Sequence, residues 1–92
     1  MDNACLIKVD GTVINVSPKN GTDFSLEELQ GFVGGNVEII DIGNNQIMCI
    51  DEEGKYKEKY INDLATFYAM GHVFGGDVIV GDALICMSFM VK

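Results

Sequence analysis

The sequence contains no arginine and no tryptophan, and its six basic residues are all lysines. Fourteen acidic residues give the chain a net charge of −8. Proteins that read DNA or RNA directly rely on basic surfaces and on the bidentate hydrogen bonds of arginine. The composition therefore argues against direct binding to nucleic acid. An acidic surface keeps a protein soluble and, less often, imitates DNA or attracts a basic partner.

A long apolar segment is also missing. The longest strongly apolar stretch, residues 83–90, is interrupted by Ser88, whereas a membrane-spanning helix needs about 20 apolar residues. The start of the chain carries an acidic residue at once, and its apolar run is too short for a secretory signal peptide. We therefore expect a cytoplasmic protein that does not associate with a membrane.

Few residues in the sequence suit catalysis. The single histidine, His72, lies in a glycine-rich segment without an acidic neighbour that would orient it. Cys5, Cys49 and Cys86 lie in separate apolar runs and form no C-x-x-C pair, so we expect reduced core thiols and not metal ligands. The glycine pairs lack the spacing of a phosphate-binding loop. We therefore expect a protein that is not an enzyme and holds neither a metal nor a cofactor.

The first helix signal lies in the second quarter of the chain. Ser25 and Glu28 have the spacing of a capping box, so a helix is expected to begin at Ser25 and to end at Gly34–Gly35. Gly31 lies inside this helix, where glycine costs about 1 kcal/mol relative to alanine. A close approach by a strand or by a ligand would explain the glycine.

A second helix is expected after Asn62, which suits the N-cap position, and Gly71 is expected to end it. Apolar residues recur between these two positions at helical spacing. The expected apolar face consists of Leu64, Phe67 and Tyr68.

The remaining apolar runs are rich in strand-forming residues and are separated by turn signals. Asp10–Gly11 suits a two-residue type I′ turn, and Gly43–Asn44–Asn45 marks another turn. We expect an α+β fold with a single domain, residues 1–92, in which a small, mostly antiparallel sheet of hairpins carries two short helices on one face. The expected strands are residues 4–9, 12–16, 37–42, 46–50, 78–80 and 83–90.

Half of the lysines occur between residues 55 and 60, where Lys55, Lys57 and Lys59 alternate with other residues. If this segment is extended, the three lysines share one face. Two interpretations remain open. The segment is either an edge strand that lysines protect from unwanted pairing, or a strip that faces a phosphate or a nucleotide.

Three segments resemble one protein family. They are residues 26–40 (LEELQGFVGGNVEII), residues 51–66, which begin DEEGK and contain Asn62, Ala65 and Thr66, and residues 77–84 (DVIVGDAL). In this order and spacing they are similar to a small domain of unknown function that is common in Firmicutes, their phages and mobile elements. The resemblance runs from Ser25 to Cys86. The family usually has arginine where this chain has Asp63, which argues against an anion-binding role carried over from the family.

The resemblance implies a bacterial host cell and no particular reaction. The first hypothesis is a non-enzymatic phage-type or mobile-element-type protein that binds or sequesters a small nucleotide-like host defence signal. Each residue of its expected site also suits a purely structural role, as a helix cap or part of an amphipathic face. The expected ligand-binding residues are Lys57, Lys59, Asn62, Thr66, Tyr68, Gly81 and Asp82.

The second hypothesis is an acidic interaction protein that inhibits a basic host protein, in the manner of a DNA mimic. The net charge of −8 supports it, although Lys55 to Lys59 interrupt the acidic residues. Both hypotheses include a homo-oligomer, because Met87, Phe89 and Met90 are hard to bury in so small a core.

Overall fold

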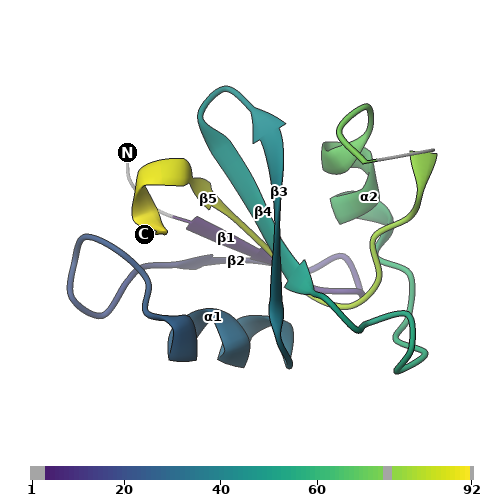
Figure 1. The fold of residues 1–92 in the computed structure, drawn as a ribbon, viewed down its shortest axis with the longest axis horizontal. Coiled ribbons are helices and arrows are strands. Elements are labelled where there is room, and N and C mark those ends of the chain that lie inside the picture. Colours follow the sequence, from purple (N-terminus) through teal and green to yellow (C-terminus); the bar gives the residue numbers. More distant parts are fainter. Residues whose placement is uncertain (1–3, 74–75, 92) are drawn as a thin grey trace.

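The computed structural model describes residues 4–73 and 76–91. The α+β class is confirmed, because the chain forms five strands and two α-helices (Figure 1). In chain order the elements are β1 (Ala4–Ile7), β2 (Val13–Val16), α1 (Leu26–Val33), β3 (Val37–Gly43), β4 (Gln46–Asp51), α2 (Asp63–Ala69), β5 (Ala83–Met87) and a 3-10 helix, η2 (Ser88–Met90).

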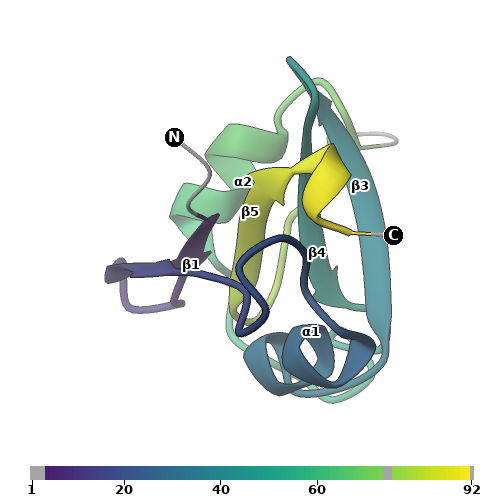
Figure 2. The same ribbon diagram turned by 90° about the vertical axis from the view of Figure 1, so that its left-hand side faces the viewer.

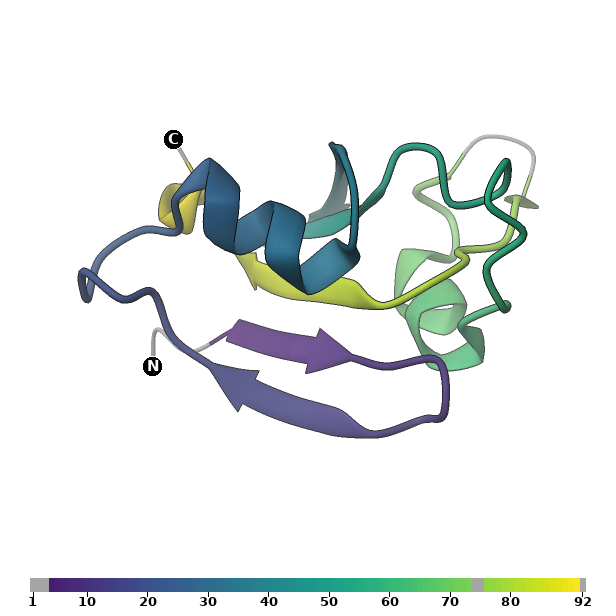
Figure 3. The ribbon, with the colours of Figure 1, turned by 90° about the horizontal axis from the view of Figure 1, so that it is seen from below.

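The five strands form one antiparallel sheet in the order β2-β1-β5-β4-β3. The two hairpins, β1–β2 and β3–β4, are formed by neighbouring stretches of the chain. The strand β5 lies between them and pairs with β1 on one side and with β4 on the other. The outer strands are therefore β2, at the lower margin of Figure 3, and β3, at the right-hand margin of Figure 2.

The turn between β1 and β2 is not the two-residue type I′ turn that was predicted at Asp10–Gly11. Lys8 N–H donates to Thr12 O, and Gly11 N–H donates to Lys8 O, so the β1–β2 loop has three residues and only Gly11 of the pair has a positive φ, of 91°. The Asp10 carboxylate accepts the Thr12 N–H at 2.8 Å and stabilises this wider loop. The left-handed pair of a type I′ turn occurs in the β3–β4 hairpin instead, at Asn44–Asn45, with φ values of 57° and 61°.

The prediction that both helices cover one face of the sheet is wrong. Leu29 and Val33 of α1 belong to one buried cluster, and Ala65 and Ala69 of α2 belong to a second cluster. The strands β1, β4 and β5 contribute alternate residues to both clusters, so the helices lie on opposite faces. The central strands are apolar at consecutive positions, and such strands need a cover on each face.

The first helix begins as its sequence predicts. The Ser25 hydroxyl accepts the Glu28 N–H, and the Glu28 carboxylate accepts the Ser25 N–H, which completes the capping box. The backbone N–H of Ser25, followed by that of Lys19, holds the pKa of Glu28 below its usual value. Gly34 ends the helix in the left-handed conformation, with φ of 78°.

The apolar face predicted for α2 is wrong at Phe67 and Tyr68, which are 64% and 50% exposed. The buried residues of this helix are instead Ala65 and Ala69. The Asn62 amide ties the start of the helix directly to main-chain oxygens of the sheet region. Because these hydrogen bonds hold the start of the helix close to the sheet, only small side chains such as alanine fit between the helix and the sheet.

The C-terminal run does not continue as one strand to Met90. The strand β5 ends at Met87, and η2 turns Met90 into the core, where its carbonyl accepts the Phe24 N–H at 2.8 Å. Met90 is therefore buried within one subunit, whereas Phe89 stays exposed. The predicted strand at residues 78–80 is reduced to a single bridge, Ile61–Val80.

The lysine-rich segment is not extended, so the edge-strand interpretation is wrong. Residues 52–58 form successive turns, with backbone hydrogen bonds from Lys57 N–H to Glu53 O and from Lys59 N–H to Gly54 O. The Asp51 carboxylate accepts the Glu53 N–H at 2.9 Å and so starts this series of turns.

Candidate functional site

The lysines of this segment bind a buried carboxylate. Oδ2 of Asp51, at the end of β4, lies 2.7 Å from Lys59 Nζ and 2.9 Å from Lys57 Nζ. Burial of Asp51 raises its pKa, but the hydrogen bonds from Lys59 and Lys57 outweigh that effect and lower the pKa to about 2. Asp51 is therefore ionised at neutral pH, and both lysines neutralise it.

The same two lysines bind the C-terminal end of α1. Lys59 Nζ donates to Val33 O at 2.8 Å, and Lys57 Nζ donates to Gly34 O at 3.3 Å. These carbonyls carry the negative end of the helix dipole, which favours a cation. Gly35 permits the approach, because a Cβ there would lie 2.7 Å from Asp51 Oδ1. The charges that were predicted to face a nucleotide are thus used inside the protein.

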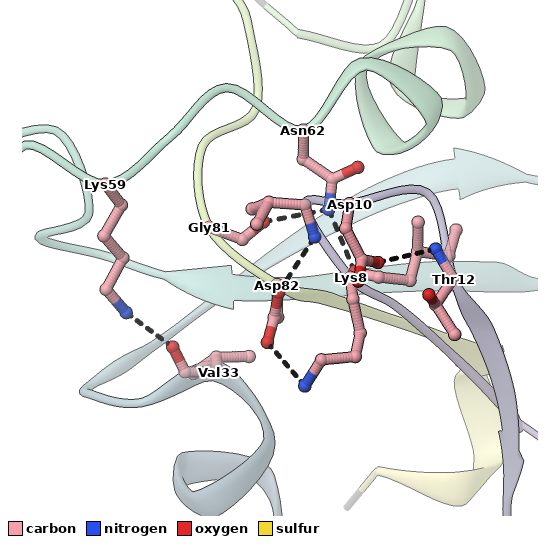
Figure 4. A network of polar contacts seen from close by, with 10 residues as sticks. Lys8, Asp10, Thr12, Val33, Lys59, Asn62, Gly81 and Asp82 are labelled. Atoms are coloured by element: carbon pink, nitrogen blue, oxygen red, sulfur yellow. Dashed lines mark hydrogen bonds and ion pairs between the residues drawn. The ribbon is translucent and has the colours of Figure 1, made fainter.

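Asn62 and Thr66 join three segments of the backbone. Asn62 is fully buried, and its Nδ2 donates to Ile7 O and to Gly81 O, each at 2.9 Å (Figure 4). Its Oδ1 accepts the Ala65 N–H at 3.0 Å and caps α2. The Thr66 hydroxyl donates to Asn62 O and accepts the Ile79 N–H. These contacts match the structural role that the sequence also allowed for both residues.

The structure brings three of the predicted ligand-binding residues to one hollow of about 430 Å³. Lys59, Gly81 and Asp82 line it, whereas Asn62 lies behind Gly81 and Tyr68 is on the exposed side of α2. Asp82 is paired with Lys8 at 3.3 Å and accepts the Val9 N–H (Figure 4). The other lining residues are Val9, Gly31, Phe32, Val33, Gly34, Glu58 and Tyr60.

This small hollow offers little attraction to a phosphate. Its one lysine, Lys59, already binds Asp51 and Val33 O. Glu58 and Asp82 add negative charge to the lining. An anion would therefore have to compete with an ion pair and with a helix end.

A larger cleft of about 780 Å³ lies along β3, and Lys55 and Tyr56 of the lysine-rich segment line it. Five acidic residues line it, namely Glu38, Asp41, Asp51, Glu52 and Asp77. Its basic side chains are those of Lys55 and His72. The remaining lining residues are Ile39, Ile40, Ile50, Tyr56, Val73, Val78, Ile79 and Val80.

The acidic residues of the cleft are not neutralised equally. Lys55 forms an ion pair with Asp77 and holds the pKa of that carboxyl below its usual value. Glu38 and Glu52 are exposed and have no ion-pair partner within residues 4–73 and 76–91. Beside them, Tyr56 is 90% exposed, and Ile40 and Ile50 are partly buried. The cleft therefore combines free negative charge with accessible apolar surface.

Sequence reasoning missed this cleft because its residues come from three separate segments. Residues 37–42 were predicted only as a strand, and His72 was placed only in a glycine-rich segment. The signal that was present is the acidic and apolar mixture at Glu38–Asp41, which leaves Ile39 on the surface between acids. Only the folded chain places the three segments around one space.

Two of the three cysteines lie in the core. Cys49 and Cys86 are buried beneath α1 on neighbouring strands, as predicted for core thiols, and Cys5 is partly buried; all three are free. Hydrogen bonding to Cys86 and burial both raise the pKa of the Cys49 thiol. In the part of the chain that the structure describes, no group of three His, Cys, Asp or Glu residues is placed to hold a metal ion.

No helix in the described residues is long and apolar enough to cross a membrane. The fold is that of a small α+β domain, with one helix on each face of a five-stranded antiparallel sheet. The chain belongs to the family described as Domain of unknown function (DUF3846), whose sequence model matches residues 4–89. This match confirms the family resemblance of residues 25–86. Comparison with the curated proteins and with the solved structures gave no match.

Proposed function

We propose that this protein is a non-enzymatic binding protein that holds a basic region of another protein in the cleft along β3. The single observation that carries the proposal is the set of unneutralised acids, Glu38 and Glu52, beside the exposed side chain of Tyr56 and the partly buried side chains of Ile40 and Ile50. Lysine and arginine have apolar stems and charged ends, so they complement such a surface. The proposal develops the hypothesis of an acidic interaction protein.

The net charge of the chain supports the same partner. At −8, the protein attracts basic surfaces over several ångströms and repels nucleotides and other polyanions. Attraction of this kind accelerates association and weakens with salt. The volume of the cleft, about 780 Å³, is in the range of pockets that enclose small ligands, so the cleft can take individual basic side chains of a partner.

The nucleotide hypothesis has less support from the geometry. Its expected lysines, Lys57 and Lys59, bind Asp51 and the end of α1. Its expected cap, Asn62, has both amide hydrogens bound to main-chain oxygens. A nucleotide would also meet Glu58 and Asp82 in the smaller hollow. A thermal-shift panel of nucleotides tests this hypothesis directly, because a ligand at 100 times its Kd stabilises by about 2.7 kcal/mol.

The proposal is tested with two variants that carry the same change in net charge. The cleft variant combines Glu38→Gln, Asp41→Asn and Glu52→Gln, and the control combines Glu27→Gln, Glu53→Gln and Asp63→Asn at exposed positions outside the cleft. Binding of a fluorescent lysine-rich peptide is measured by anisotropy at low and high salt. We expect the cleft variant to bind about tenfold more weakly than the control, which corresponds to about 1.4 kcal/mol.

Two results would contradict the proposal. Equal losses in the two variants would mean that only the net charge attracts the peptide. A stabilising nucleotide together with no peptide binding would support the nucleotide hypothesis instead. Asn at position 41 keeps an acceptor for the Gly43 N–H, so the cleft variant retains the turn after β3.

A further inference from the structure

The outer edge of β3 pairs with no other strand of the described residues. This strand is seven residues long, pairs with β4 on one side and is outermost in the sheet (Figure 2). Edge strands are commonly protected by lysine, by proline or by being very short. Residues 37–43 (VEIIDIG) contain no lysine and no proline; their protective features are the acids Glu38 and Asp41 and a register shift between Asp41 and Gly43, and these acids do not repel a basic strand. The main-chain N–H and C=O groups of the outer edge are therefore available to another strand.

The cleft includes this edge of the strand. Four consecutive residues of β3, Glu38 to Asp41, line it. Successive side chains of a strand point to opposite faces of the sheet, so a space that contacts four in a row also contacts the edge between the faces. Tyr56 and Val78 form part of the remaining wall. An extended segment placed there would lie beside the main chain of β3.

We infer that the basic partner adds an extended segment to β3 as a further antiparallel strand; this inference rests on the proposed function. Residues directly opposite each other in paired strands contact one another. The partner therefore needs a basic residue opposite Glu38, apolar residues opposite Ile39 and Ile40, and a basic residue opposite Asp41. The recognised pattern is basic–apolar–apolar–basic, which reads the same in both chain directions.

A second copy of this chain is a poor occupant of the β3 edge. Two copies that pair antiparallel through this same edge place each acid opposite an apolar residue, for example Glu38 of one copy opposite Ile40 of the other when the pair is centred on Ile39. Neither acid then has a basic residue opposite it. The charge pattern thus selects a basic strand from another protein.

The inference is tested with the synthetic peptides TKVVKT and TVKKVT, which have the same composition and charge. We expect TKVVKT to bind at least about fivefold more tightly and to lose its binding when alternate backbone nitrogens are methylated, because methylation removes main-chain donors. In the protein, Ile39→Lys is expected to reduce binding about tenfold, and the matched variant Ile14→Lys on the other edge strand is expected to leave it unchanged.

The outcomes separate this inference from the proposed function. Equal binding of the two peptides, insensitive to methylation but lost in the cleft variant, would overturn strand addition and leave the cleft as a site for basic partners. Binding of neither peptide, nor of the lysine-rich peptide, would overturn both. A dimer that Ile39→Lys dissociates would show that a second copy occupies the edge and would also overturn the inference.

Discussion

Asp51 connects three parts of the molecule through one carboxylate. It ends β4, accepts the N–H that starts the turns after it, and binds the two lysines that contact the end of α1. Buried ion pairs of this kind are costly to break, because removal of one partner leaves a charge without compensation. The carboxylate therefore fixes the segment between the two candidate hollows.

Asp51→Asn is expected to lower the free energy of unfolding at pH 7 by about 2 kcal/mol, since the pKa of Asp51 is lowered from 3.8 to about 2 in the folded protein. A lowered carboxyl pKa stabilises the folded state above the unfolded pKa and less as the pH falls. The difference between wild type and variant should therefore shrink to about half at pH 3. Urea unfolding at several pH values measures it.

The control for this prediction is Glu27→Gln, an exposed acid in the first turn of α1. This control should change the pH dependence little. A difference between wild type and Asp51→Asn that stays constant from pH 7 to pH 3 would contradict the assignment.

For individual residues, the sequence predicted local roles such as helix capping, but it did not predict which distant residues the side chains contact. Asn62 was correctly predicted as a helix cap, because capping depends on residues three positions apart. Its bond to Ile7 O spans 55 positions, and the bond from Lys59 to Val33 O spans 26. A contact between residues this far apart in the chain leaves no local pattern in the sequence. The lysines therefore suggested an anion site, whereas in the structure they bind a carboxylate and a helix end.

Among the secondary-structure elements, local signals were again the ones that could be interpreted. Both helix starts and both hairpins follow from neighbouring residues, and all four were predicted. The faces that the helices cover depend on how the hairpins meet, which is set by the non-local pairing of β5. The consecutive apolar residues of β4 and β5 carried a usable signal, because they indicate burial on both faces.

The structure removes one of the two explanations for a glycine at position 31, inside α1. No protein atom from another part of the fold would lie within 4 Å of a Cβ at this position, so no strand approaches it closely. The expectation that a strand would explain this glycine is wrong. The alternative of a ligand remains untested, since Gly31 lines the smaller hollow.

Gly31→Ala is expected to stabilise the protein by about 1 kcal/mol, because alanine has a higher helix propensity and fewer unfolded conformations. For a domain of this size that corresponds to an increase of several degrees in Tm. Thermal unfolding followed by circular dichroism measures the change. A lower Tm for Gly31→Ala would mean that the fold needs this glycine. Gly21→Ala serves as the control: Gly21 has φ of 84°, a conformation that alanine rarely adopts, so this variant should lower the Tm of the protein.

For the whole molecule, the expectation of a homo-oligomer stays a prediction, but its basis changes. Met90 is buried inside the subunit and no longer supports it. The strand β2 supports it better, since this outer strand has no charged residue and its Val13 and Ile14 are 49% and 42% exposed (Figure 3). Two such edges can pair without like-charge repulsion.

We therefore predict a dimer formed through β2. Light scattering across a concentration series should show it, and Ile14→Lys should shift it to monomer, because a buried, unpaired lysine opposes association. Ile39→Lys, on β3, should leave the dimer intact. A monomer at every concentration would contradict this prediction without affecting the proposed role of the cleft.

The central position of β5 has a consequence for how the chain is made. Ribosomes synthesise both hairpins well before the strand that joins them, so the nascent chain first contains two half-sheets with apolar edges and no partner between them. Such long-range pairing also slows folding, because distant segments must meet before the pairing stabilises them. Once both hairpins have been made, the growing polypeptide therefore remains as two incomplete halves, which become one domain only when β5 has left the ribosome.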